Sequence, residues 1–148
     1  MNVLIRKAKE EDLPSILALL SEVDEPNQDS ISLQKARAIF SQIQSYPNYH
    51  IYIALIEEDV VGTFALLMMD NLVHNGAPSG IVEDVAVRTA WQGRGIGKQM
   101  MEYAMKLCKE AGCYKLSLSS NIKRENAHKF YESLGFIKYG YSFVVDIA

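Results

Sequence analysis

The sequence has no long hydrophobic run and almost no cysteine. Its longest apolar stretch, residues 60–69, is interrupted by Gly62 and Thr63, and it is far shorter than the roughly 20 residues that a membrane-spanning helix needs. Two cysteines, Cys108 and Cys113, are too few for a disulfide framework or a four-cysteine zinc site. We therefore expect no membrane span, no disulfide scaffold and no zinc site.

A large excess of charge of one sign is also missing. Fifteen Lys and Arg residues stand against 18 Asp and Glu residues, which gives a net charge of −3. A chain with this net charge has no positive electrostatic field that would bind nucleic acid or anionic membranes non-specifically. The three histidines, His50, His74 and His128, lack metal-ligand spacing, so no catalytic metal is expected. The N-terminus lacks the apolar region of a secretory signal, and we expect a cytoplasmic protein.

What the sequence does contain is typical of one globular domain spanning residues 1–148. Apolar residues make up 49% of the chain and charged residues 22%, close to the average for globular proteins. Periodicity and turn residues predict an order of strand, two helices, several strands, helix, strand, helix and strands. The expected strands are residues 3–8, 51–56, 60–67, 81–87, 114–119, 136–139 and 141–146, and the expected helices open near residues 11, 32, 97 and 126. This order indicates a mixed α/β sheet flanked by helices.

The most informative segment is the turn from Trp91 to Lys98, which contains three glycines. Glycines let backbone amides approach a ligand closely, and the start of a helix adds partial positive charge. The turn therefore suits a pyrophosphate, although a tight turn without a ligand has the same composition. A P-loop is excluded because Gln92 and Gln99 occupy its required positions, and a dinucleotide fingerprint is excluded because Lys98 and Met100 stand where its third glycine belongs.

The pattern Gln92-x-x-Gly95-x-Gly97, preceded by the strand residues 85–87, resembles the acetyl-CoA-binding segment of the GCN5-related N-acetyltransferase (GNAT) family. Residues 5–12 resemble the family's first strand and turn, and residues 126–136 resemble its C-terminal motif. The resemblance implies a mostly antiparallel sheet with a splayed parallel pair, flanked by helices, and acetyl-CoA as the co-substrate. It also implies transfer of an acetyl group to a primary amine by direct attack.

By this resemblance, the cofactor contacts come mainly from the backbone. Main-chain groups of the Val85-Ala86-Val87 strand contact pantetheine, and amides in the following turn hold the pyrophosphate. The turn residues are Gln92, Gly93, Arg94, Gly95, Ile96, Gly97 and Lys98. The side chains of Arg94 and Lys98 either contact phosphate as well or remain solvated. Asn126 either contacts the cofactor, as the resemblance implies, or caps the last helix.

Two residues are candidates for catalysis. Tyr131 stands where the family often places its general acid, but its spacing with Ala127, Phe130 and Leu134 also suits a core tyrosine. Glu83 is the candidate base, because a carboxylate in an apolar strand needs an explanation. Its neighbour Asp84 faces the opposite side of the sheet unless a β-bulge re-aims one of the two.

Other interpretations of the carboxylate pair stay open. Glu83 could instead be an edge carboxylate bound to amides, and the amine could lose its proton through water. The resemblance further assigns polarisation of the thioester carbonyl to the amide of Val85.

The acceptor is predicted to be a small amine that carries phosphate or phosphonate. Local similarity to glucosamine-phosphate and aminoalkylphosphonate N-acetyltransferases supports this, with Glu83, Asp84, Lys123 and Arg124 as candidate acceptor contacts. Serine or asparagine stands where the resemblance to the sugar-phosphate enzymes implies an acidic residue near the end of the fifth strand. The alternatives are a protein or peptide N-acetyltransferase and a non-catalytic acyl-CoA-binding regulatory module. The apolar segment 141–146 makes a homodimer plausible.

Overall fold

The computed structural model describes residues 2–23 and 31–148, so the polar turn expected at residues 24–27 lies outside the described residues. The chain divides into two compact units, Met1–Ser117 and Leu118–Ala148. Each unit is described by itself. The first carries the sheet and three α-helices, and the second carries the last helix.

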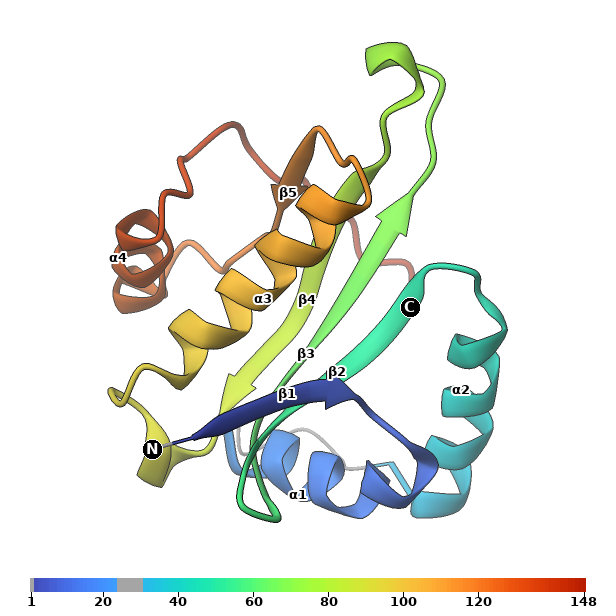
Figure 1. Cartoon of the computed structure of the whole chain (residues 1–148), viewed down its shortest axis with the longest axis vertical. Helices are drawn as coiled ribbons and strands as arrows, with labels where there is room; N and C mark the ends of the chain where they lie inside the picture. Colours follow the sequence, from blue (N-terminus) through green and yellow to red (C-terminus); the bar gives the residue numbers. More distant parts are fainter. Residues whose placement is uncertain (1, 24–30) are drawn as a thin grey trace. The chain divides into compact units, whose positions relative to one another are not determined.

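The first unit begins with strand β1 (Val3–Lys7), a 3-10 turn η1 (Glu10–Asp12) and helices α1 (Leu13–Val23) and α2 (Leu33–Ser45). Strands β2 (Tyr49–Ile56), β3 (Asp59–Met69) and β4 (Ser79–Val87) follow, with η2 (His74–Gly76) between the last two. The unit ends with η3 (Thr89–Trp91), α3 (Ile96–Glu110) and β5 (Lys115–Ser117). Figure 1 shows this order along the chain.

The five strands form one sheet in the order β1-β2-β3-β4-β5. The first three pairings are antiparallel, and β4 pairs with β5 in parallel. This confirms the predicted mixed sheet with one parallel pair.

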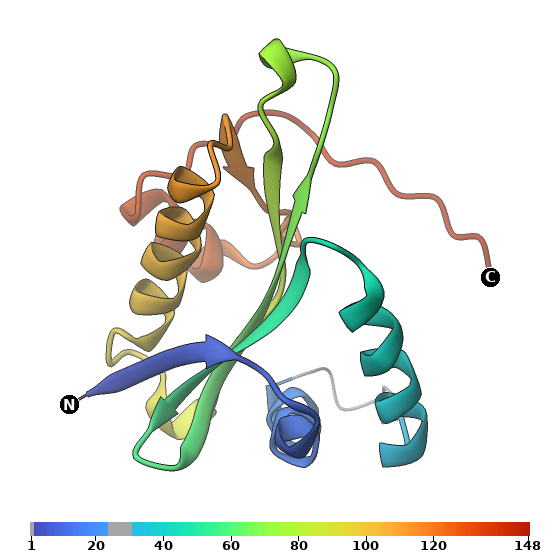
Figure 2. The same ribbon diagram turned by 45° about the vertical axis from the view of Figure 1, so that its right-hand side comes forward.

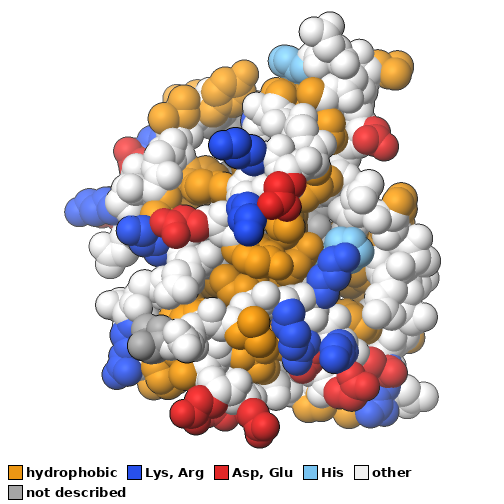
Figure 3. Space-filling view, in the orientation of Figure 1, with side chains coloured by type: hydrophobic (Ala, Val, Ile, Leu, Met, Phe, Trp, Pro, Cys, Tyr) orange, Lys and Arg blue, Asp and Glu red, His pale blue; other side chains and the backbone are white. Residues whose placement is uncertain are grey.

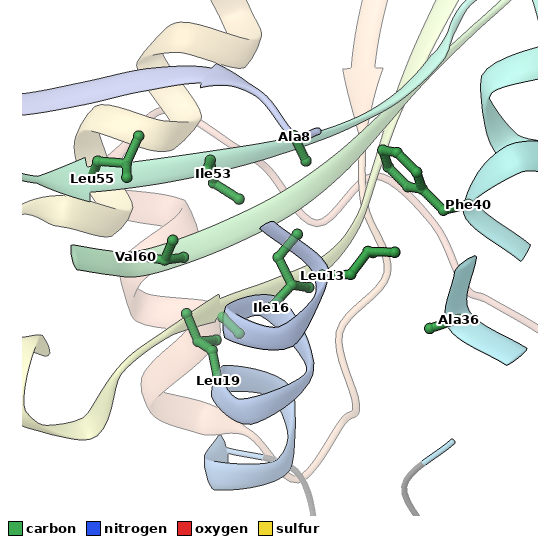
Figure 4. Packing of buried hydrophobic residues seen from close by; sticks show 10 residues of the cluster. Ala8, Leu13, Ile16, Leu19, Ala36, Phe40, Ile53, Leu55 and Val60 are labelled. Atoms are coloured by element: carbon green, nitrogen blue, oxygen red, sulfur yellow. The ribbon is translucent and has the colours of Figure 1, made fainter. Parts of the chain in front are cut away.

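Helices cover both faces of the sheet. Figure 2 shows α3 on one side of the sheet and α1 and α2 on the other. On the α1 side, Leu13, Ile16 and Leu19 of α1 point toward Ile53 and Val60 of the strands, which Figure 4 shows from close by. The apolar spacing i, i+3, i+6 in α1 creates this buried stripe.

On the α3 side, glycines in the strands let the helix come close. A Cβ at Gly62 would lie 2.8 Å from the sulfur of Met100, and a Cβ at Gly80 would lie 2.5 Å from the sulfur of Cys108. A side chain at either position would force the neighbouring sulfur-containing side chain of α3 to shift. Close packing of α3 fixes where its N-terminus lies relative to β4.

The second unit contains α4 (Glu125–Ser133). Gly135, at φ 97°, follows the helix in a left-handed conformation, as expected of a helix stop. The prediction of strands at residues 136–139 and 141–146 is wrong, because both segments are irregular. Residues 137–148 are exposed and pair with no strand among the described residues. An extended segment without a partner is not a stable strand.

Charged side chains of both signs lie on the surface (Figure 3). On the face drawn in Figure 3, positive and negative side chains are interspersed rather than gathered by sign. No helix among residues 2–23 and 31–148 is both long and apolar enough to cross a bilayer.

Candidate active site

The predicted β-bulge is present in β4 at the two carboxylates. Ala65 of β3 faces Glu83 and Thr63 faces Ala86, so the single residue Phe64 lies opposite both Asp84 and Val85. Asp84 has φ 54°, in the left-handed region, which aspartate tolerates better than most residues but which still costs about 1 kcal/mol or more. Both carboxylates are exposed to solvent. The bulge therefore breaks the strict alternation that would send them to opposite faces.

Glu83 lies on the face of the sheet that α1 and α2 cover. Its partner is Ala65, and Ala65 in turn pairs with Ile51 of β2. Paired residues of an antiparallel sheet share a face, and Ile51 packs against the core formed with α1 and α2. An acceptor that approaches Glu83 would therefore come from this side.

The edge of β4 beyond the bulge is not covered by β5. Strand β5 pairs only with Ser79, Gly80 and Ile81, whereas β4 continues to Val87. Backbone groups on an open strand edge can accept an extended ligand as an added strand. Val85 and Val87, both half-buried, stand on this part of β4. The arrangement fits the pantetheine arm that the sequence predicts here.

The glycine-rich turn presents backbone donors at the start of α3. Gly93 and Gly95 have φ 77° and 83°, and Gly95 is the residue before the helix. The first bond of the helix runs from the amide of Gln99 to the carbonyl of Gly95, over 3.1 Å. The amides of Ile96, Gly97 and Lys98 precede that bond and have no partner within the helix. They supply the donors that a pyrophosphate requires.

Side chains of the glycine-rich turn make contacts that stabilise it. The amide nitrogen of Gln92 donates to the carbonyl of Val87 over 3.0 Å, so its side chain closes the turn onto the end of β4. The guanidinium of Arg94 lies over the ring of Trp91, 4.9 Å from its centroid. The ammonium of Lys98 lies 3.9 Å from a carboxylate oxygen of Glu102. These exposed cations thus contact neighbours within unit 1, and phosphate contact by either stays a prediction.

Hydrogen bonds from α1 hold the residues that precede this turn, and the sequence does not predict them. Glu22, in α1, accepts a hydrogen bond from the amide of Thr89 at 2.9 Å and another from Arg88 at 3.1 Å. Arg88 also donates to the carbonyl of Val60 at 2.8 Å. The hydrogen bonds from Thr89, and then the charge of Arg88, hold the pKa of Glu22 below its usual value. No local pattern signals a pair separated by 66 residues.

In the second unit, a hollow of about 360 Å³ lies at the N-terminus of α4. Its lining is Lys123, Arg124, Glu125, Asn126 and Ala127. Asn126 lies in the first turn of the helix, whose cap is Arg124, so the capping role considered for Asn126 is not realised. The hollow brings the two predicted acceptor cations together with the predicted cofactor contact Asn126.

Tyr131 lies on α4 among aromatic side chains. Its ring is 5.1 Å from that of Phe130 and 5.7 Å from that of Phe136. Burial raises the pKa of Tyr131, and the nearby charge of Arg124 opposes part of that rise. The hydroxyl thus stays protonated across the neutral range, as a proton donor must. Glu83 belongs to the first unit and Tyr131 to the second.

Comparison with known proteins decides the family. Residues 33–136 match the model of the acetyltransferase (GNAT) family. The chain belongs to the GNAT family. It is an acetyl-CoA-dependent N-acetyltransferase, and acetyl-CoA is its co-substrate. The family thus favours an enzyme over the non-catalytic module.

Relatives of this GNAT enzyme include acceptor-specific enzymes. It is 33% identical over 132 residues to the aminoalkylphosphonate N-acetyltransferase of Salmonella typhimurium, covering 89% of this chain and 83% of that one. It is also 33% identical over 100 residues to the glucosamine 6-phosphate N-acetyltransferase of Arabidopsis thaliana, covering 65% and 64%. A solved structure of glucosamine-6-phosphate N-acetyltransferase from Arabidopsis thaliana shares the fold, with a TM-score of 0.86, 24% identity and full coverage of both chains (100% each).

No group of three or more potential metal-ligating side chains occurs among the residues that the GNAT structure describes.

Proposed function

We propose that this GNAT enzyme transfers the acetyl group of acetyl-CoA to a small primary amine that carries a phosphate or phosphonate group. The observation that carries the proposal is the bulge in β4. The bulge lies between Glu83 and Ala86, in the part of β4 whose edge is not covered by β5, and this supports Glu83 as the base and the amide of Val85 as the carbonyl-polarising donor. Base and carbonyl-polarising donor thus lie two residues apart on one strand.

The cofactor is held mainly by backbone groups in this proposal. The open edge of β4 at Val85, Ala86 and Val87 pairs with the pantetheine arm. The amides from Gln92 to Lys98 hold the pyrophosphate, aided by the partial positive charge at the start of α3. The carbonyl of Val87 already accepts from Gln92, so its second lone pair is the one available to pantetheine.

Transfer then proceeds by direct attack. Glu83 takes a proton from the acceptor ammonium, and the amine nitrogen attacks the thioester carbonyl carbon. The amide of Val85 donates to the carbonyl oxygen as negative charge develops there. The carbon–sulfur bond breaks as Tyr131 protonates the departing thiolate. The positively charged nitrogen of the new amide then loses its extra proton to the Tyr131 phenolate, directly or through solvent, and Glu83 releases its proton to solvent. The products are an N-acetylated amine and free coenzyme A.

The acceptor class rests on relatives and on charge. The aminoalkylphosphonate enzyme matches over most of both chains, and Lys123 and Arg124 supply two cations beside one hollow. Asp84 is the second carboxylate that can attract the amine. The cytoplasmic location expected from the sequence stays a prediction.

A panel of acceptors tests the proposal by release of free coenzyme A. It contains 2-aminoethylphosphonate, glucosamine 6-phosphate, a polyamine, free amino acids and lysine-containing peptides. We expect turnover with one or more of the anionic small amines, at a kcat/KM well above that of every peptide. Turnover restricted to peptides or protein N-termini would overturn the proposed acceptor and favour a protein N-acetyltransferase.

A further inference from the structure

Glu22 follows the buried stripe of α1. The stripe runs through Leu13, Ile16 and Leu19 at intervals of three residues, and all three side chains are buried. Glu22 continues the same spacing by one step, and residues three apart in a helix are neighbours on its surface. Figures 1 and 2 show α1 at the end of the sheet where β4 leads into the glycine-rich turn. The stripe therefore ends in a carboxylate that faces the end of β4.

The Glu22 carboxylate caps η3, the short turn that follows β4. Arg88 is the residue before η3, and its side chain makes no cap hydrogen bond. One oxygen of Glu22 instead accepts from the amide of Thr89 over 2.9 Å. The other oxygen accepts from the guanidinium of Arg88 over 3.1 Å. A side chain of α1 thus holds the backbone at the point where β4 ends.

Arg88 joins this contact to β3. Its amide donates to the carbonyl of Val61, and its Nε atom donates to the carbonyl of Val60, each over 2.8 Å. Its own carbonyl accepts from the amide of Trp91 over 2.8 Å, which closes η3. The residues that lead into the glycine-rich turn are therefore tied to α1 and to β3 at the same time.

The glycine-rich turn has little stiffness of its own. Gly93 and Gly95 both have positive φ, and glycine loses more conformational freedom on ordering than any other residue. The far end of the turn is fixed by the close packing of α3 on Gly62 and Gly80, and the near end is held by Glu22. Backbone donors are fixed to one another, so a small displacement of the turn misplaces several of them together.

We propose that Glu22 is a positioning residue for coenzyme A. By holding Thr89 and Arg88, it keeps the turn in the conformation that presents its amides to the pyrophosphate. Glu22 acts through the backbone between Thr89 and Gly95 and not by touching the ligand. The inference rests on the proposed function, because it takes this turn as the pyrophosphate site.

Calorimetry with coenzyme A and with pantetheine, which lacks the pyrophosphate, tests the inference. We expect Glu22→Ala to weaken coenzyme A binding by roughly 10-fold and pantetheine binding by less than about 2-fold, because only coenzyme A uses the turn. Alanine is the strongest helix former, so α1 should persist in this variant. Glu22→Gln keeps an oxygen that can accept from Thr89, and its affinity for coenzyme A should stay within roughly 3-fold of the unaltered protein.

Asp12→Asn is the matched control for a purely structural effect. Asp12 accepts two hydrogen bonds from Arg6, at 2.7 Å and 3.0 Å, at the opposite end of α1. This variant should be less stable than the unaltered protein, but its preference for coenzyme A over pantetheine should not change.

Three results would overturn the inference. They are an unchanged affinity of Glu22→Ala for coenzyme A, equal losses for coenzyme A and pantetheine, and the same loss of preference in Asp12→Asn as in Glu22→Ala. In each case, a clear preference of the unaltered protein for coenzyme A leaves the proposed pyrophosphate site standing. Equal affinities of the unaltered protein for the two compounds would overturn that site, and the inference with it.

Discussion

Tyr131 has the environment of a proton donor because its surroundings disfavour the phenolate. It packs beside Phe130 and Phe136, and burial raises its pKa. We expect Tyr131→Phe to slow acetyl transfer by roughly 10–1000-fold, within the range of general acid catalysis, while the affinity for coenzyme A stays nearly unchanged. Single-turnover kinetics and calorimetry measure the two effects. An unchanged rate of the chemical step would leave Tyr131 as a core residue only.

Asp12 ties the end of β1 to the start of α1. Its carboxylate accepts two hydrogen bonds from Arg6 and one, at 2.7 Å, from the amide of Lys9. The bond with Arg6 is the main reason that the pKa of Asp12 lies below its usual value of 3.8. A lowered carboxyl pKa gives stability that is present above the unfolded-state pKa and is lost as pH falls through the folded-state value.

We therefore expect Asp12→Asn to lower the free energy of unfolding by about 1–2 kcal/mol at pH 7. The difference from the unaltered protein should shrink as the pH falls below 4. Urea unfolding at pH 7, 4 and 3 measures this. Glu10→Gln is the control, because Glu10 and Arg37 form an exposed pair at 3.8 Å that contributes little. Equal effects of the two substitutions at pH 7 would contradict this account of Asp12.

Individual residues differ in how well the sequence predicts them. Glu83 and Asp84 stand out because carboxylates interrupt an apolar strand, and the motif around Tyr131 is local. Glu22 carries no such signal, because its partners Arg88 and Thr89 lie far along the chain.

The bulge in β4 is the element on which the base assignment depends. Glu83 shares a row with Ala65 and Ile51, whereas Asp84 takes the left-handed position of the bulge. We expect Glu83→Gln to lower kcat/KM by roughly 100-fold or more, within the range of general base catalysis. Asp84→Asn is the matched control, since asparagine tolerates φ > 0 equally well, and it should cost much less.

Steady-state kinetics with the best acceptor from the panel compare these two variants. A larger loss for Asp84→Asn would transfer the role of base to Asp84. Small losses for both would indicate that the amine loses its proton to water.

Elements with strong local signals are predicted well. Ser32 caps α2 by accepting from the amide of Lys35 at 3.1 Å, as its place before an amphipathic run predicts. The β2–β3 hairpin and the helix stop at Gly112, at φ 77°, likewise follow from turn residues. The segments 136–139 and 141–146 fail because alternation of apolar residues describes a possible strand, whereas a strand also needs a partner.

Beyond single elements, the exposed C-terminal segment bears on assembly. Phe143 is 94% exposed and Val145 77% exposed, which is unusual for large apolar side chains on one short segment. We propose that this segment pairs with a second copy of the chain, as the sequence predicts for a homodimer. Replacing Phe143 and Val145 together by Asp should convert a dimer into a monomer, measured by sedimentation, whereas Gly140→Asp should not. A monomeric unaltered protein would contradict the proposal.

For the molecule as a whole, we propose that the sheet, the packing of α3 and the turn before it together position backbone donors for the pyrophosphate of coenzyme A. Close contact at Gly62 and Gly80 fixes α3 against the sheet, and the left-handed Gly95 opens its N-terminus. Calorimetry that compares coenzyme A with pantetheine, which lacks the pyrophosphate, measures the contribution of that turn most directly. The account predicts that coenzyme A binds roughly 10–100-fold more tightly. Equal affinities of the folded protein for the two compounds, or no affinity for coenzyme A, would contradict it.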